Sequence, residues 1–201
     1  MAGEGFSWLL RGDLLGLSLA FGREMGVETL LHRMGADPTT VALRGQDADL
    51  NPDGYPSYRE ELGDLSYEED GYVVRAGVYG DWAWAWEETS WQCVADAELI
   101  KRVSSGTVAL TIFHNLDGST ALAYAEDGVV ITVLDTLRDP LLRGVGGSDP
   151  ERFRTFLPAV DDGFDDPLAM ILTFVEQHFG AGIREADLMR HPVWSARLIP
   201  T

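Results

Sequence analysis

The sequence is short of cysteine, of basic residues and of long apolar runs. Cys93 is the only cysteine among 201 residues, so no internal disulfide can form, which is typical of proteins of the reducing cytoplasm. Only 15 Lys and Arg residues stand against 33 Asp and Glu residues, and the formal net charge is −18. Because an acidic surface repels phosphate, nucleic acid and anionic membranes are poor candidate partners.

Signals for export or membrane insertion are also missing from the sequence. The first four residues carry no basic side chain, whereas a signal peptide begins with a positively charged region. The early apolar stretch Leu14–Phe21 is interrupted by Gly16 and Ser18. No run approaches the roughly 20 apolar residues of a membrane span. We therefore expect a cytoplasmic protein without a membrane segment.

What the chain does contain is enough apolar material for a sizeable core. Hydrophobic residues make up 45% of the sequence, with 6 Trp, 6 Tyr and 8 Phe. A chain of this length falls near the usual domain size of about 100–200 residues. We therefore predict one domain over residues 1–201.

Helix signals lie towards both ends of the sequence. Over 27–34 apolar residues recur at helical spacing, and Gly35 follows where a helix is expected to end. Asp166-Pro167 predicts the start of a second helix that Gly180 ends. Its apolar stripe consists of Leu168, Ile171, Leu172, Val175 and Phe179. Weaker signals predict short helices at 6–15, at 97–103 and after Asp149-Pro150, and a flexible loop over 144–148.

The middle of the chain has the alternating pattern of β-strands. Strands are predicted at 72–78, 82–87, 107–114, 120–125 and 129–134, and their short connections favour antiparallel neighbours. Shorter strand-like stretches lie at 17–21, 39–43 and 193–199. The predicted fold class is α+β: an antiparallel meander sheet of about five to six strands with helices packed on one face.

Trp82, Trp84 and Trp86 alternate with alanines and therefore share one face of their strand. Such a stripe could stack against a sugar or a Pro-rich segment of a partner. Large aromatic side chains more often anchor the core of a small domain, which is the interpretation we favour.

An acidic segment covers residues 46–70. It contains nine carboxylates and a single basic residue, Arg59, and is broken by prolines and glycine. Within it, Asp49, Asn51, Asp53, Tyr55 and Glu60 have the spacing of oxygen ligands in a calcium-binding EF-hand loop. Pro56 and the lack of a second loop argue against this site, and a solvated acidic turn is the simpler interpretation. Ca²⁺ is thus a minority hypothesis for the 49–60 loop, and no other cofactor is expected.

Catalytic signals are sparse. His114 and Asn115 end a predicted strand, and Glu87 ends another, so a small enzyme could use them for acid–base chemistry. A solvated turn histidine and an exposed edge glutamate are the ordinary alternatives. No zinc-ligand spacing, phosphate-binding loop or serine-hydrolase motif is present, and Cys93 is more typical of a buried thiol than of a nucleophile.

Several motifs occur in order along nearly the whole chain. They are Phe6-Ser7-Trp8-Leu9, Arg33-Met34-Gly35-Ala36, Trp84-Ala85-Trp86-Glu87, Arg102-Val103-Ser104-Ser105-Gly106-Thr107, Phe113-His114-Asn115, Tyr124-Ala125-Glu126-Asp127-Gly128 and Gly147-Ser148-Asp149-Pro150. In these motifs the chain resembles an uncharacterised actinobacterial family of single-domain proteins of unknown function. The resemblance implies a single α+β domain and no particular activity, and the acidic segment looks like an elaboration of this member.

Charge and composition together favour a cytoplasmic protein-binding or regulatory module over an enzyme. A strongly acidic, aromatic-rich domain suits a protein partner with a basic face, because opposite charges steer association. The alternatives are a small enzyme with a site near His114, Asn115 and Glu87, and a Ca²⁺-dependent structural domain. The sequence leaves the partner and the oligomeric state open.

Overall fold

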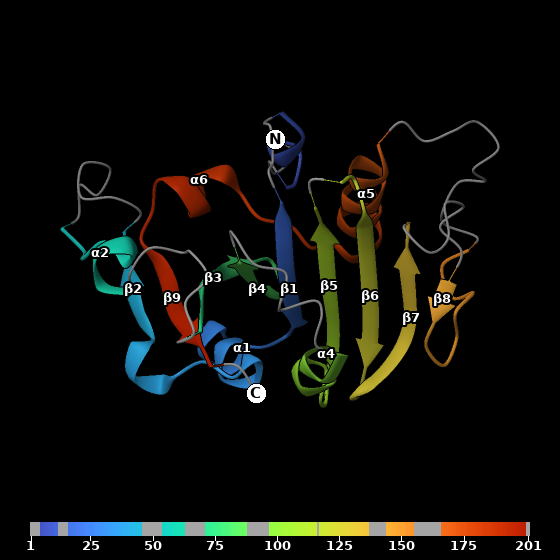
Figure 1. Cartoon of the computed structure of the whole chain (residues 1–201), viewed down its shortest axis with the longest axis horizontal. Helices are drawn as coiled ribbons and strands as arrows, with labels where there is room; N and C mark the ends of the chain where they lie inside the picture. Colours follow the sequence, from blue (N-terminus) through green and yellow to red (C-terminus); the bar gives the residue numbers. More distant parts are fainter. Residues whose placement is uncertain are drawn as a thin grey trace.

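The chain folds around one continuous β-sheet to which both ends of the sequence contribute strands (Figure 1). The computed structural model describes residues 5–11, 16–45, 54–62, 71–87, 97–115, 117–136, 144–154 and 166–199. The strands are β1 (Leu17–Arg23), β2 (Ala42–Arg44), β3 (Tyr72–Tyr79), β4 (Trp82–Glu87), β5 (Val108–His114), β6 (Thr120–Glu126), β7 (Val129–Asp135), β8 (Gly144–Gly146) and β9 (Val193–Leu198). The helices are α1 (Val27–Met34), α2 (Tyr58–Leu62), α4 (Ala97–Val103), α5 (Pro167–Phe179) and α6 (Glu185–Met189), with 3₁₀ turns η1 (Leu9–Arg11) and η2 (Pro38–Thr40).

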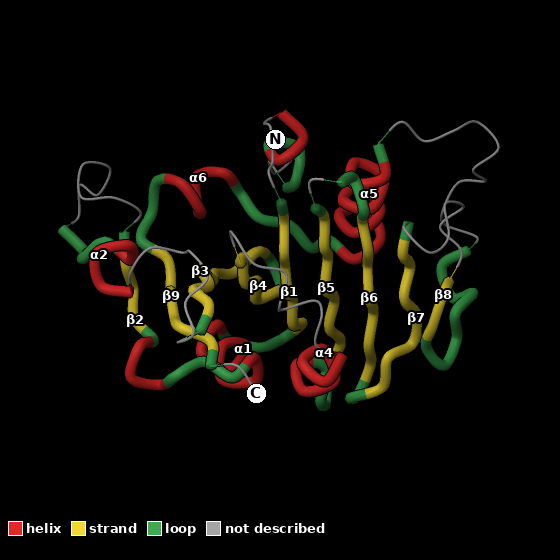
Figure 2. The backbone as a smooth tube through the Cα atoms, viewed as in Figure 1, coloured by secondary structure: helices red, strands yellow, loops and turns green. Residues whose placement is uncertain are grey.

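The strand order is β2-β9-β3-β4-β1-β5-β6-β7-β8 (Figure 2). Every neighbouring pair of strands is antiparallel. The prediction of an antiparallel sheet is confirmed, but a size of five to six strands is wrong because the sheet has nine. A meander describes only the run from β5 to β8. The first strand of the chain is inserted between β4 and β5, and the last between β2 and β3, so long-range pairing holds the sheet together.

One face of the sheet, which we name the tryptophan face, carries Trp82, Trp84 and Trp86. Their exposed fractions are 2%, 0% and 5%, so the core interpretation of the stripe is confirmed. The N-terminal segment, α5 and α6 cover this face, and the predicted stripe of α5 packs in the same cluster. The Trp82 indole N–H donates to the Phe179 carbonyl at 3.0 Å, which fixes the end of α5 on β4.

The opposite face, which we name the alanine face, carries Ala83 and Ala85 and is also covered by helices. Here α1 and α4 pack against a row of small side chains. Strand register aligns Ala76, Ala85, Ala20, Thr111 and Ala123 across five strands. The prediction that helices pack on one face is therefore wrong. Alanine is compatible with either a solvated or a buried face, so the alternation alone did not reveal the second layer.

Local signals predicted the two long helices well. In α5 the Asp166 side chain accepts from the Ala169 N–H at 3.0 Å, and Pro167 occupies the first turn. Gly35 after α1 and Gly180 after α5 both adopt the left-handed conformation that a side chain disfavours. None of the described helices is long and apolar enough to cross a membrane.

Other local predictions are wrong. Within 6–15, the described part forms only the short turn η1, and residues 150–154 form turns rather than a helix. The expected flexible loop at 144–148 instead contributes the edge strand β8, which pairs with β7. Glycine-rich sequence hides this strand, because Val145 is its only residue that favours a strand and it lies between two glycines.

Candidate functional site

His114 lies at the end of β5 on the tryptophan face, beside the first residue of β6. Its Nδ1 is 2.9 Å from the Thr120 hydroxyl, and the two residues are direct partners in the strand pairing. Burial lowers the pKa of His114, while the nearby Asp166 carboxylate opposes this shift. The imidazole is therefore half-buried and hydrogen-bonded, in contrast to the solvated histidine that the sequence suggested.

Asn115 stabilises the turn that follows β5. Its side-chain oxygen accepts from the backbone N–H groups of Asp117 at 3.1 Å and Ser119 at 3.0 Å. This is an Asx turn, in which a short amide side chain replaces a backbone acceptor. The side-chain oxygen of Asn115 therefore stabilises the hairpin turn between β5 and β6.

Glu87 occupies the other face of the sheet. It is 2% exposed, and its Oε2 accepts from the Ser18 hydroxyl at 3.3 Å, so the expected exposed glutamate is wrong. Register pairs Ser18 with Glu87, and it pairs the adjacent residue Leu17 with His114. Because successive side chains point to opposite faces, Glu87 lies on the alanine face and His114 on the tryptophan face. The structure does not bring the three predicted enzyme residues into one site.

The predicted calcium loop falls mostly outside the described residues. Asp49, Asn51 and Asp53 lie there, as does Cys93, and so does the side chain of Glu60, whose backbone belongs to α2. Tyr55 is described and is 39% exposed. Among the residues that the structure describes, no group of three or more His, Cys, Asp or Glu side chains could hold a metal ion. The Ca²⁺ hypothesis stays a prediction.

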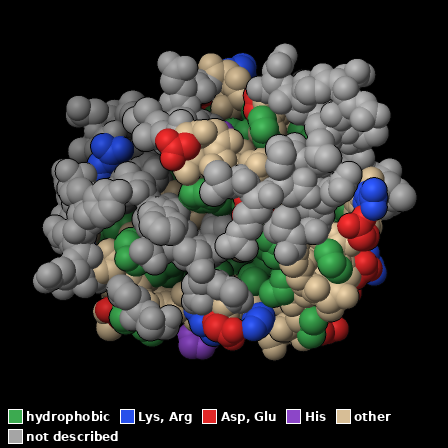
Figure 3. Space-filling model, turned by 45° about the vertical axis from the view of Figure 1, so that its right-hand side comes forward, with side chains coloured by type: hydrophobic (Ala, Val, Ile, Leu, Met, Phe, Trp, Pro, Cys, Tyr) green, Lys and Arg blue, Asp and Glu red, His purple; other side chains and the backbone are tan. Residues whose placement is uncertain are grey.

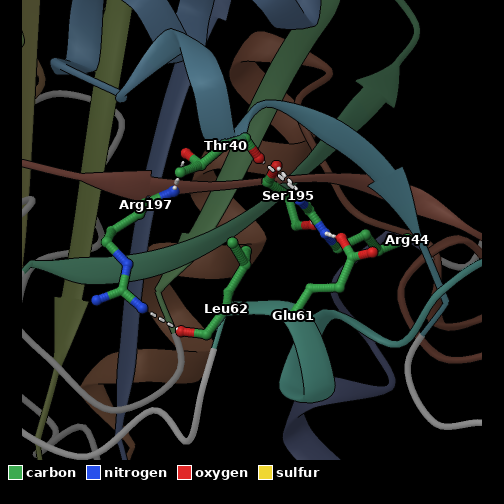
Figure 4. Close-up of polar contacts among 6 residues, drawn as sticks. All are labelled: Thr40, Arg44, Glu61, Leu62, Ser195 and Arg197. Atoms are coloured by element: carbon green, nitrogen blue, oxygen red, sulfur yellow. Dashed lines mark hydrogen bonds and ion pairs between the residues drawn. The ribbon is translucent and has the colours of Figure 1, made fainter.

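The best-defined polar cluster joins the acidic segment to the edge of the sheet (Figure 4). Arg44 of β2 is only 6% exposed, and its Nε donates to the Glu61 carboxylate of α2 at 2.7 Å. Its Nη1 donates to the carbonyl of Thr40 at 2.8 Å and to the carbonyl and hydroxyl of Ser195, each at 3.1 Å. A buried cation thus links η2, β2 and β9 to the helix α2.

Three further contacts hold the same helix. Arg197 of β9 donates to the Leu62 carbonyl, as Figure 4 shows. Leu62 is 4% exposed and packs with Val73 of β3. The Gly45 N–H donates to the Pro56 carbonyl at 3.0 Å, just before α2 begins. We name this set, together with Arg44–Glu61, the α2 anchor; it fixes the middle of the acidic segment on the sheet.

Arginines elsewhere in the described chain also serve the interior. Arg33 of α1 donates to the Val103 carbonyl at 2.8 Å, and Arg102 of α4 donates to the Arg33 carbonyl at 3.2 Å. Each arginine satisfies a carbonyl near the C-terminal end of the other helix, where cations are favoured. Arg75, 3% exposed, donates to the Leu188 carbonyl at 3.1 Å. Each of these three arginines therefore stabilises the fold by donating to a backbone carbonyl.

Sequence reasoning missed the α2 anchor. The 46–70 segment was expected to be a surface loop, whereas residues 58–62 form a helix docked on β9. The available signal was Arg44 at the end of a short strand, 17 residues before Glu61. That spacing does not mark an ion pair. Glu61 lies beside Arg44 because α2 packs on β9, which is inserted beside β2.

The sequence matches a family of unknown function, DUF6461, over residues 7–168. The chain belongs to this family, which confirms the resemblance seen in its motifs; the match does not bear on an actinobacterial origin. No curated protein and no solved structure matches the chain.

Proposed function

We propose that this protein is a cytoplasmic protein-binding or regulatory module that engages a partner with a basic face through its acidic segment. The observation that carries the proposal is the uneven distribution of charge. The described residues contain 18 carboxylates and 13 basic side chains, so the remaining segments contain 15 carboxylates and only two basic side chains. Most of the excess negative charge is therefore carried outside the described scaffold.

The scaffold itself is close to balanced. Its exposed cations form ion pairs such as Arg152–Glu126 at 3.4 Å and Lys101–Glu98 at 2.6 Å. Figure 3 shows Asp and Glu side chains beside Lys and Arg side chains at the right-hand and lower margins of one face. Paired charges of this kind produce little net field, whereas an excess of carboxylates over basic residues attracts a cationic partner over a distance.

The 46–70 segment carries part of this charge on both sides of the docked helix α2. Residues 46–53 and 63–70 carry seven of its carboxylates, and each stretch starts and ends at described residues near the α2 anchor. We therefore propose that the partner binds near α2, which lies at the β2–β9–β3 end of the sheet. This favours recognition of a Lys/Arg-rich protein surface rather than nucleic acid or a membrane, whose phosphates the segment repels.

Affinity purification from native lysate tests this proposal when two charge variants are compared. One variant carries Glu68→Gln, Glu69→Gln and Asp70→Asn. The matched control carries Glu28→Gln, Asp117→Asn and Asp127→Asn, which remove the same charge from exposed scaffold positions.

We expect a basic partner to be retained at low salt, released at high salt, and lost with the first variant but not with the control. Retention that resists salt, or that weakens equally with both variants, would contradict recognition by the acidic segment.

A further inference from the structure

We propose that the α2 anchor is a positioning clamp, in which Arg44 and Glu61 hold α2 at the edge of the sheet and α2 can open without unfolding the sheet. The inference deepens the proposed function, because it assigns the residues that attach the acidic segment to the sheet through α2. Its physical basis is independent of any partner.

The helix α2 is too short to be stable by itself. A helix of five residues has almost no intrinsic stability, since isolated helices shorter than about 12–15 residues are marginal in water. Its Glu61 N–H donates to the Ser57 carbonyl at 3.1 Å, a single turn of hydrogen bonding. The helix therefore depends on its contacts with β2, β3 and β9.

The Arg44 guanidinium has most of its hydrogen-bond acceptors outside α2. Three of its four hydrogen bonds go to Thr40 and Ser195, which belong to the scaffold, and only the bond to Glu61 reaches α2. If Glu61 moves away, the guanidinium keeps its neutral acceptors and remains in place. The ion pair can thus open on one side, and Glu61, whose side chain is 46% exposed, is the mobile partner.

The apolar contact of α2 with the sheet is small among the described residues. There, Leu62 and Val73 form a cluster distinct from the two clusters that cover the faces of the sheet. Opening this cluster leaves the tryptophan and alanine faces intact. Local opening is drawn from regions with few buried apolar contacts, so α2 is expected to open well below the free energy of global unfolding.

Hydrogen exchange of the full chain tests the clamp without a partner. Glu61→Ala removes the charge-assisted hydrogen bond to Arg44, and alanine preserves helix propensity. The matched control is Glu98→Ala, which removes the exposed Glu98–Lys101 ion pair from α4. We expect exchange of the Gly45 and position-61 amides, which donate to the Pro56 and Ser57 carbonyls, to accelerate about tenfold or more in Glu61→Ala only, with the thermal midpoint matching that of the control.

A second substitution separates charge from hydrogen bonding. Glu61→Gln keeps an oxygen that can accept from Arg44, and we expect it to accelerate exchange less than Glu61→Ala. Equal exchange in Glu61→Ala and Glu98→Ala would overturn the clamp, as would acceleration shared by every strand. Failure to find a basic partner would overturn the proposed function and leave this result unchanged, so the two failures are distinguishable.

Discussion

The two faces of the central strands solve the problem of burial in opposite ways. Across the middle of the sheet, Trp84, Phe21, Leu110 and Tyr124 align on one face, and Ala85, Ala20, Thr111 and Ala123 align on the other. Large side chains fill the space beneath α5, α6 and the N-terminal segment. Small side chains allow α1 and α4 to approach the sheet closely.

The space between the sheet and its helices is filled by large side chains on one face, and on the other face small side chains let the helices come closer. On the tryptophan face the Trp8 ring stacks on Trp86 at a centroid separation of 5.8 Å, and its indole N–H donates to the Ile183 carbonyl at 2.7 Å. On the alanine face, the arginines of α1 and α4 contact the other helix instead. We therefore expect the tryptophan face to be sensitive to lost volume and the alanine face to added volume.

The largest effect is expected from lost volume on the tryptophan face. Leu172 of α5 is fully buried, and Leu172→Ala should lower the free energy of unfolding by about 2–5 kcal/mol through lost transfer energy and a cavity. Urea unfolding measures the change. Leu10→Ala, at a site that is 41% exposed, is the control and should change stability by no more than about 0.5 kcal/mol. A cost below roughly 1 kcal/mol at Leu172 would show that α5 is not part of the core.

Added volume should destabilise the alanine face. Ala85 is 1% exposed beneath the helix layer, and Ala85→Leu should lower the free energy of unfolding by about 1–3 kcal/mol because the helices must shift. Val78→Leu on the same face, at a site 56% exposed, should be nearly neutral. Equal effects at the two positions, measured by urea unfolding, would show that α1 and α4 do not restrict this face.

A single methyl group can test how closely the tryptophan face is packed. A Cβ atom on Gly77 would lie 2.5 Å from Cζ2 of Trp84, its direct partner across β3 and β4. Gly77→Ala should therefore lower the thermal midpoint, whereas Gly16→Ala, whose Cβ would meet nothing closer than 3.6 Å, should not. Crystals of the variant should show the Trp84 ring displaced, and an undisplaced ring would contradict the close approach.

The smallest effect concerns pH. Burial lowers the pKa of His114 in the folded protein below its unfolded value of about 6.5. The unfolded state then binds the proton more readily, so stability should be lost as pH falls below about 6.5 towards the folded pKa. Urea unfolding at pH 7.5 and 5.5 measures this loss. The free energy of unfolding should fall less between the two pH values in His114→Gln than in the unmodified protein. Identical pH dependence of stability in the two proteins would mean that burial does not lower the pKa of His114.

Much of the sheet and one of its faces could be predicted from the sequence. The Trp82–Trp86 alternation and the stripe of α5 each mark a buried surface, and the Asp166 cap and Gly180 mark the helix ends. These signals are local, because they depend on side chains within a few positions of one another. The five strands from β3 to β7 were all placed for the same reason.

The rest depends on contacts between distant parts of the chain. The insertion of β1 beside β4 and of β9 beside β3 leaves no local pattern, so the strand count and the meander were wrong. The separation of Glu87 from His114 follows from the register of β1 between their strands. Arg44 contacts both Glu61 of α2 and Ser195 of β9, which is 151 residues away in the sequence, and no local pattern marks either contact.

Steering of a basic partner by the acidic segment can be tested directly by measuring the association rate at two salt concentrations. Screening shortens the range of electrostatic attraction to about 10 Å at 0.1 M salt. If the acidic segment steers the partner, the on-rate should fall with salt, and Glu68→Gln, Glu69→Gln and Asp70→Asn together should lower it more than they raise the off-rate. The variant with Glu28→Gln, Asp117→Asn and Asp127→Asn should retain most of the rate. An on-rate that is indifferent to salt, or that falls equally in both variants, would contradict the central claim.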